Sequence, residues 1–189
     1  MIKPCPTLSR RSVLAGLFTT MAVSSAPYYA NAAGFLRGAG DIRRIRMRST
    51  RTGEALDTIY WIEGKYIPEA LAEINWFMRD WRENEVIQYD ARNVDIMAAM
   101  LNLMEADEPY HVVSGYRSPA TNRLLSRRNS GVAQNSYHMK GMAADLKLSS
   151  RSIGQMAGAA LACNAGGVGK YNRSNFVHVD CGPVRTWRG

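Results

Sequence analysis

Apolar residues recur at helical spacing in four segments of this chain. The first segment begins at Pro68, a residue that suits the first turn of a helix, and its apolar stripe extends to Trp81. Three further helices are predicted over residues 94–105, 119–128 and 152–162. The methionines of the second segment keep the same helical spacing, so we expect them to fill the core rather than to bind a metal.

Short runs of β-branched and aromatic residues predict the strands. A weakly patterned run over residues 42–47 and a clearer run over 58–62 flank the turn residues 52–54, and together they predict a hairpin. Further strands are predicted over residues 110–116, 142–148 and 176–181, and the glycine-rich stretch 166–171 forms a strand or a loop. Because helices and short strands follow one another in irregular order, without an internal repeat, the pattern predicts an α+β domain.

The N-terminal segment carries the pattern of an export signal. Arg10–Arg11 form a twin-arginine pair, a short apolar run follows over residues 13–23, and Ala30–Ala32 offers small residues at the spacing of a cleavage site. We therefore expect export to the periplasm by the twin-arginine pathway. The predicted organisation is a signal peptide over residues 1–32, a linker over 33–41 and one domain over 42–189. No mature stretch is long and apolar enough to span a bilayer, so stable membrane insertion is not expected.

The chain is basic, and removal of the signal with Lys3, Arg10 and Arg11 lowers its formal net charge from +8 to +5. In the periplasm the polyanions that a basic protein meets are cell-wall and membrane surfaces, so no nucleic-acid partner is expected. A disordered tether or a solvated strand accounts for the arginines that follow the signal: Arg37, Arg43, Arg44, Arg46, Arg48 and Arg51. The stretch 166–171 lacks the G-x-G-x-x-G register and a following helix, which argues against nucleotide binding.

Two cysteines remain after removal of the signal, which contains Cys5. In an exported protein Cys163 and Cys181 are permitted to form a disulfide, and two buried free thiols fit the sequence equally well. Both states remain open because the sequence does not give the separation of the two residues in space.

Two histidines and an aspartate form the candidate chemical centre. Strand alternation places Asp145 and His178 where they converge if their two strands pair. His138 lies in the loop before Asp145 and folds back over it, since Gly141 allows that loop to turn. Three protein ligands with a fourth position left for water is the pattern of catalytic zinc, so these residues predict a zinc hydrolase.

These residues lie in motifs that resemble a known family. The motifs are S-G-Y-R-S over Ser114–Ser118, S-x-H-x-x-G-x-A-x-D over Ser136–Asp145 and F-V-H-V-D over Phe176–Asp180. They resemble the murein endopeptidases of the YcbK/MepK type, which are related to D-alanyl-D-alanine carboxypeptidases, VanX-type dipeptidases and hedgehog-type domains. The resemblance covers most of the mature chain, from the predicted hairpin to Trp187.

The resemblance implies a fold, a metal and a substrate. The fold is hedgehog/DD-peptidase-like, with a small, mainly antiparallel sheet flanked by helices. The metal is Zn²⁺, bound by His138, Asp145 and His178. The implied reaction is the cleavage of peptide bonds in peptidoglycan, and Arg117 matches the arginine that contacts substrate or the developing oxyanion in relatives.

One position departs from the carboxypeptidase and VanX branches, in which a catalytic carboxylate lies three residues before the last histidine. Here that position is Asn175, which cannot act as a base. Asp180 shares a strand face with His178, and it is either the general base or a support that orients a ligand by hydrogen bonding. Ser136 is expected to hold the loop or a substrate group, and Tyr171 is a further candidate for substrate binding.

The sequence thus predicts a zinc-dependent endopeptidase that hydrolyses the peptide cross-links of peptidoglycan. Two alternatives remain: a carboxypeptidase that removes terminal D-alanine, and a non-catalytic, metal-containing module that binds murein. The neutral Asn175 favours the binding module, because that function needs no base at this position. Peptidoglycan is the expected partner in all three cases.

Overall fold

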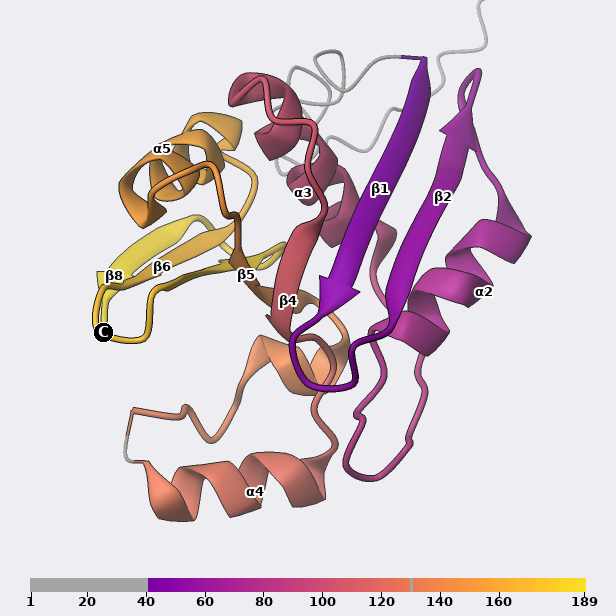
Figure 1. Cartoon of the computed structure of the whole chain (residues 1–189). Helices are drawn as coiled ribbons and strands as arrows, with labels where there is room; N and C mark the ends of the chain where they lie inside the picture. The colour runs from indigo at the N-terminus through magenta and orange to yellow at the C-terminus, as the bar shows by residue number, and fades with distance from the viewer. Residues whose placement is uncertain (1–40, 130) are drawn as a thin grey trace, which may run out of the picture.

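The computed structural model describes residues 41–129 and 131–189. The predicted signal peptide and all but the last residue of the predicted linker lie outside the described residues. The described part of the chain folds around one eight-stranded sheet with the strand order β3-β2-β1-β4-β5-β7-β6-β8 (Figure 1). No helix among these residues is long and apolar enough to cross a membrane.

The predicted hairpin forms one side of the sheet. Strand β1 (Ile42–Ser49) pairs antiparallel with β2 (Ala55–Ile62), and the two-residue strand β3 (Lys65–Tyr66) extends the edge. Alternation along β1 buries Ile45 and Met47 against the helices and leaves Arg44 exposed on the opposite face.

Arg43 lies on the buried face of β1. The expectation of a disordered tether or a solvated strand is therefore wrong for this arginine. Its side chain is 5% exposed, and its guanidinium lies 2.7 Å from a carboxylate oxygen of Asp95. Tyr60 and Tyr66 donate their hydroxyls to the same carboxylate. The arginine is buried because the two-residue period of the strand places it on the same side as Ile45.

The predicted central strands are confirmed, with small shifts at their ends. Strand β4 (Tyr110–Ser114) pairs with β1 in parallel, and β5 (Ala143–Lys147) pairs antiparallel with both β4 and β7 (Phe176–Asp180). The glycine-rich stretch is strand β6 (Gly167–Tyr171), antiparallel to β7.

A further strand, β8 (Arg185–Arg188), lies beyond the segment in which the sequence predicts strands, and it pairs in parallel with β6. The expectation of a mainly antiparallel sheet therefore holds only in part, because the sheet is mixed: β1–β4 and β6–β8 are parallel pairs. The α+β class is confirmed.

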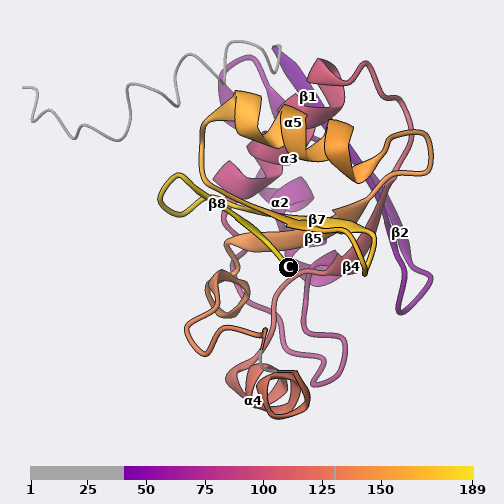
Figure 2. The same ribbon diagram turned by 90° about the vertical axis from the view of Figure 1, so that its left-hand side faces the viewer.

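Helices cover one face of this sheet. Helices α3 (Ala91–Leu103) and α5 (Ile153–Cys163) pack side by side over β1, β6 and β7, and α2 (Pro68–Phe77) lies against β2 (Figure 1). In Figure 2, α4 (Pro119–Arg128) lies on the other side of the sheet from α5. The face of the sheet opposite α3 and α5 carries the candidate site, near β5 and β7.

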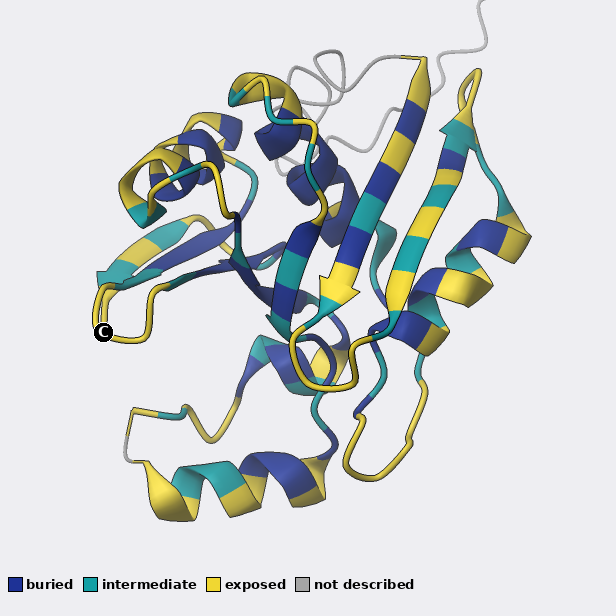
Figure 3. Ribbon diagram, viewed as in Figure 1, coloured by how far each residue is buried: buried dark blue, intermediate teal, exposed yellow. Residues whose placement is uncertain are grey.

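Buried residues of the sheet and of helices α2, α3 and α5 form the core, and the buried stretches of these elements are dark blue in Figure 3. Met97 and Met100 are 0% exposed, which confirms that the methionines of this helix fill the core. Cys163 and Cys181 are both buried and free, and burial raises the pKa of each thiol to about 12.

Helix α2 ends earlier than the apolar stripe predicts. Met78 caps the helix, and its carbonyl accepts a hydrogen bond of 2.8 Å from the amide of Tyr116. Two residues later the Asp80 carboxylate accepts a hydrogen bond from the amide of Ser118, the N-cap of α4. These tertiary contacts turn the chain away from the helix axis, so Trp81 is 42% exposed instead of buried.

Candidate metal centre

His138 reaches the centre from a tight turn. The turn is the 3₁₀ helix η2 (Tyr137–Lys140), whose N-cap Ser136 accepts a hydrogen bond of 3.3 Å from the amide of His138. Gly141 ends the turn with φ 63°, and a Cβ there would lie 2.8 Å from Ile87 Cδ1. Glycine is therefore required both for the left-handed backbone and for the close packing.

Asp145 and His178 come from neighbouring strands in direct register, since their Cα atoms are partners in the β5–β7 ladder. Residues opposite one another in a sheet point to the same face, so both side chains project toward His138. Asp145 Oδ1 lies 2.9 Å from His178 Nδ1 and 3.2 Å from His138 Nε2, and the two ring nitrogens lie 3.2 Å apart. All three residues are buried: His138 is 1% exposed, Asp145 is 4% exposed and His178 is 7% exposed.

The second nitrogen of each imidazole fixes its tautomer. His138 Nδ1 lies 2.6 Å from the carbonyl oxygen of Gly115, which accepts hydrogen bonds only, so this nitrogen carries the proton. His178 Nε2 lies 3.0 Å from Asp180 Oδ2 and donates for the same reason. When both imidazoles are neutral, the two nitrogens that face Asp145 therefore present lone pairs, which is the arrangement of metal-binding histidines supported by a carboxylate or carbonyl.

The charge states of this group suit a metal. Burial lowers the pKa of His138 to about 4, and the nearby Arg117 guanidinium acts in the same direction. Burial alone would raise the pKa of Asp145, but His138, His178 and Arg117 hold it well below its usual range. At neutral pH His138 is therefore a neutral imidazole and Asp145 a carboxylate, the protonation states in which these groups bind metal ions. Burial alone would lower the pKa of His178, but its hydrogen bonds with Asp145 and Asp180 raise it, so this imidazole must release a proton to bind a metal ion.

A sequence model of one protein family, described as peptidoglycan L,D-endopeptidase MepK, matches residues 37–187. The chain belongs to this family. It is 40% identical over 145 residues to the peptidoglycan L,D-endopeptidase MepK of Escherichia coli strain K12, covering 77% of this chain and 80% of that protein. It is also 37% identical over 148 residues to a probable peptidoglycan L,D-endopeptidase MepK of Haemophilus influenzae, covering 78% and 80% of the two chains.

A solved structure, the L-Ala D-Glu endopeptidase ChiX of Serratia marcescens, is 22% identical. The match covers 50% of this chain and 68% of the ChiX chain, with a TM-score of 0.34. This similarity is too slight to support an argument about the site.

Asp180, the other acidic residue of the family motif, lies behind His178. It is 1% exposed, and its two oxygens accept hydrogen bonds from His178 Nε2, the amides of Gly167 and Gly182, and both terminal nitrogens of Arg185. Burial alone would raise the pKa of Asp180, but the hydrogen bonds from His178 and Arg185 hold it far below its usual range.

Arg117 reaches the centre from the segment between β4 and α4. Its Nη2 lies 2.5 Å from Asp145 Oδ2, and its Nε donates a hydrogen bond of 2.8 Å to Ser114 Oγ. The guanidinium therefore binds the Asp145 oxygen that does not face the histidines. Asn175, by contrast, lies exposed in the turn between β6 and β7, with φ 52°.

Tyr171 joins the site through an aromatic group that the sequence did not predict. Its hydroxyl accepts a hydrogen bond of 2.9 Å from Trp187 Nε1, and its ring stacks on Phe176. The Trp187 ring centre lies 5.1 Å from that of His178. Trp187 fits here because it covers Gly169, where a Cβ would lie 2.5 Å from its ring.

Arg185 and Trp187 are the site residues that sequence reasoning missed, and both belong to β8. The signal that could have found them is their spacing, because two residues that are two positions apart on a strand point to the same face. The segment is only four residues long and carries no apolar alternation of its own, so the strand was not expected.

Proposed function

We propose that this protein is an exported, zinc-dependent peptidoglycan endopeptidase that cleaves an L,D-peptide bond. The observation that carries the proposal is the set of three buried ligand atoms, two of them imidazole nitrogens whose lone pairs are directed by hydrogen bonds on the far side of each ring. Family membership supplies the reaction class, because the related proteins are named peptidoglycan L,D-endopeptidases.

His138, Asp145 and His178 would hold the zinc ion through Nε2, Oδ1 and Nδ1. All three atoms lie within 4.8 Å of one another, and two nitrogens with one carboxylate oxygen are a donor set that zinc accepts in hydrolases. A zinc ion supplies a Lewis acid that polarises the scissile carbonyl and lowers the pKa of water. The protein contributes the fixed positions of the ligands, which need no rearrangement when substrate binds.

Arg117 is assigned two tasks. Its contact with Asp145 holds that carboxylate so that Oδ1 faces the histidines. Its positive charge lies at the edge of the same centre, where negative charge develops on the carbonyl oxygen during peptide hydrolysis. A fixed guanidinium stabilises that charge more than it stabilises the neutral substrate, and this difference lowers the barrier.

Asp180 is assigned a positioning role rather than that of the general base. A carboxylate that accepts several hydrogen bonds, from a histidine, two amides and an arginine, has little capacity left to take a proton. Its low pKa also makes it a weak proton acceptor at neutral pH. Through His178 Nε2 it holds the imidazole in the tautomer and orientation that present Nδ1 to the metal.

Digestion of purified peptidoglycan tests the proposed function. Protein loaded with zinc should convert cross-linked muropeptides into uncross-linked ones, chelator should abolish this conversion, and mass spectrometry of the products identifies the bond cut. Release of terminal D-alanine alone would assign a carboxypeptidase instead. Sedimentation with the cell wall and no soluble products would assign the murein-binding module, which the neutral and exposed Asn175 favours.

We also propose that the protein is exported to the periplasm by the twin-arginine pathway. The support is the order of Arg10–Arg11, a short apolar run and the Ala30–Ala32 site in the sequence. The substrate class agrees with this location, since the cell wall lies outside the cytoplasm.

A further inference from the structure

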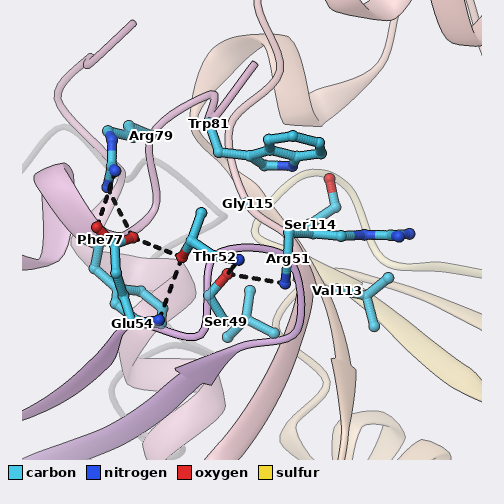
Figure 4. A pocket seen from close by; sticks show the side chains of 11 residues that line it. Ser49, Arg51, Thr52, Glu54, Phe77, Arg79, Trp81, Val113, Ser114 and Gly115 are labelled. Carbon is cyan, nitrogen blue, oxygen red and sulfur yellow. Dashed lines mark hydrogen bonds and ion pairs between the residues drawn. The ribbon is translucent and has the colours of Figure 1, made fainter. Parts of the chain in front are cut away.

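A pocket adjoins the metal centre on the side of the hairpin turn. It lies between the β1–β2 turn, the loop after α2 and the end of β4, and Arg51, Trp81, Ser114 and Gly115 are among its lining residues (Figure 4). It is partly open to solvent, and its space of about 300 Å³ includes part of that open solvent. An extended peptide bound at the centre can therefore place a neighbouring group in this pocket.

The pocket and the metal centre share part of their walls. Gly115 lines the pocket, and its carbonyl accepts the hydrogen bond from His138 Nδ1. Ser114 receives the Nε hydrogen bond of Arg117, whose other end contacts Asp145. A ligand in the pocket thus lies beside the backbone segment that positions two of the proposed metal ligands.

The charge at this pocket is positive and only partly neutralised. Glu54 lines the pocket, but both of its oxygens are bound by Arg79, which also lines it. The guanidinium of Arg51 forms no ion pair with any carboxylate in the described part of the chain. The same is true of Arg82, which stacks on the outward ring of Trp81 at 4.3 Å.

The arginines around the pocket act on one another. The pKa of Arg82 is lowered, mainly by partial burial. Among the neighbouring charges the Asp80 carboxylate has the largest effect and opposes this shift, whereas the positive charges of Arg51, Arg117 and Arg128 add to it. Like charges held this close repel, and an anion between them removes the repulsion. Two unpaired guanidinium groups beside a tryptophan ring are well suited to a planar carboxylate, because each presents a rigid fork of N–H donors.

We propose that Arg51 in the pocket and Arg82, which stacks on the Trp81 ring at its wall, bind a free carboxylate of the peptidoglycan peptide whose scissile bond lies at His138, Asp145 and His178. This inference rests on the proposed function. The peptides of the cell wall carry free carboxylates on the residues that flank their cross-links. A carboxylate bound here fixes the register of the peptide, so the neighbouring bond is the one presented for cleavage.

A pair of matched substrates tests this subsite. One is a purified cross-linked muropeptide with its free carboxylates, and the other is the same compound with those carboxylates amidated. The proteins are the zinc-loaded wild type, Arg51→Gln, Arg82→Gln and the double variant. Lys65→Gln is the control, because it removes one exposed positive charge on the edge strand β3, away from the pocket.

We expect the wild type to prefer the acid over the amide by about 10-fold or more in kcat/KM, the size of one charge-assisted hydrogen bond. Each arginine variant should lower that preference, the double variant should bring it close to 1, and the loss should appear in KM for the acid. Lys65→Gln should keep the wild-type preference. Circular dichroism of each variant checks that the fold is retained.

An unchanged preference in the double variant, or no preference in the wild type, would overturn the subsite while leaving the proposed function in place. Failure of the wild type to cleave either compound would instead reject the proposed function and the subsite with it. An equal loss of activity on acid and amide in the arginine variants would also overturn the subsite, because loss of a charge-assisted contact should weaken the acid more than the neutral amide.

Discussion

Asp145 and His178 stand opposite one another in the β5–β7 ladder, and Asp145 Oδ1 lies 2.9 Å from His178 Nδ1. Two residues in direct register on paired strands cannot move apart without breaking the sheet. The ladder therefore fixes two of the three proposed metal ligands, and only His138 depends on a turn for its position.

The first prediction concerns the metal itself. Purified protein should contain about one zinc ion per chain, the stoichiometry of a single three-ligand site. His138→Ala and His178→Ala should each lose zinc and activity together, measured by elemental analysis and by peptidoglycan digestion. His111→Ala is the matched control: His111 lies on β4, where its ring contacts Ser149 at 3.1 Å, and its removal should leave zinc content unchanged. Full zinc occupancy in both ligand variants would contradict the assignment.

The second prediction separates the two roles of Asp180. If it positions His178, Asp180→Asn should weaken zinc affinity by about 10–100-fold, and excess zinc should restore turnover. A general base would instead leave zinc affinity intact and lower turnover by about 10²–10⁴-fold. Competition with a chromogenic chelator measures affinity, and Asp57→Asn, an exposed carboxylate paired with Arg44, serves as the control. Loss of turnover that excess zinc cannot restore would refute the positioning role.

Arg117 gives the third prediction. Arg117→Ala should reduce kcat by about 10²–10³-fold, the usual loss when one donor to a developing oxyanion is removed. Arg117→Lys should recover part of this loss, because it keeps the charge but not the planar fork that spans Ser114 and Asp145. Zinc content distinguishes a direct effect on turnover from a displaced Asp145. Wild-type kcat in Arg117→Ala would remove this residue from the reaction.

The fourth prediction concerns stability and the buried arginine of β1. Arg43→Ala should lower the free energy of unfolding by about 3–5 kcal/mol, because it leaves the Asp95 carboxylate buried without its ion-pair partner. Arg44→Ala removes the neighbouring but exposed pair with Asp57 and should leave the denaturation midpoint almost unchanged. Urea unfolding followed by circular dichroism compares the two variants. Equal midpoints would mean that the buried pair contributes no more than the exposed one.

The fifth prediction concerns export. Replacing both Arg10 and Arg11 by lysine keeps the charge but removes the pair that the twin-arginine receptor recognises. The precursor should then accumulate in the cytoplasm, as immunoblots of cell fractions would show. Lys3→Arg is a comparable exchange in the same segment and should not alter export. Normal export of the double-lysine variant would exclude this route.

The residue pattern predicted the parts of the fold that depend on local alternation. Val177 and Val179 alternate with His178 and Asp180, and this alternation was enough to place both polar residues on one face of β7. The convergence of Asp145 and His178 followed from pairing two such strands, and the structure has that pairing.

Features that depend on distant partners were not predicted. Strand alternation places Arg43 on the side of Ile45, but a charged residue is stable there only because Asp95, 52 residues away, supplies the counter-charge, and that partner is not part of any local pattern. Strand β8 forms because β6 offers an unpaired edge and because Gly169 leaves space for Trp187. Trp81 fits the helical spacing of α2, yet contacts from Tyr116 and Ser118 turn the chain before that residue is reached.

The two buried thiols have a consequence for the order in which folding and transport occur. Cys163 and Cys181 are enclosed in the finished fold, and a protonated, enclosed thiol reacts slowly with oxidants. A chain that folds before it crosses the membrane brings both sulfur atoms into an oxidising compartment already shielded. A chain that crossed unfolded would expose them there to disulfide exchange, with each other or with other proteins. If the protein is exported by the proposed twin-arginine route, folding before transport would thus protect it from the reactions of its own cysteines.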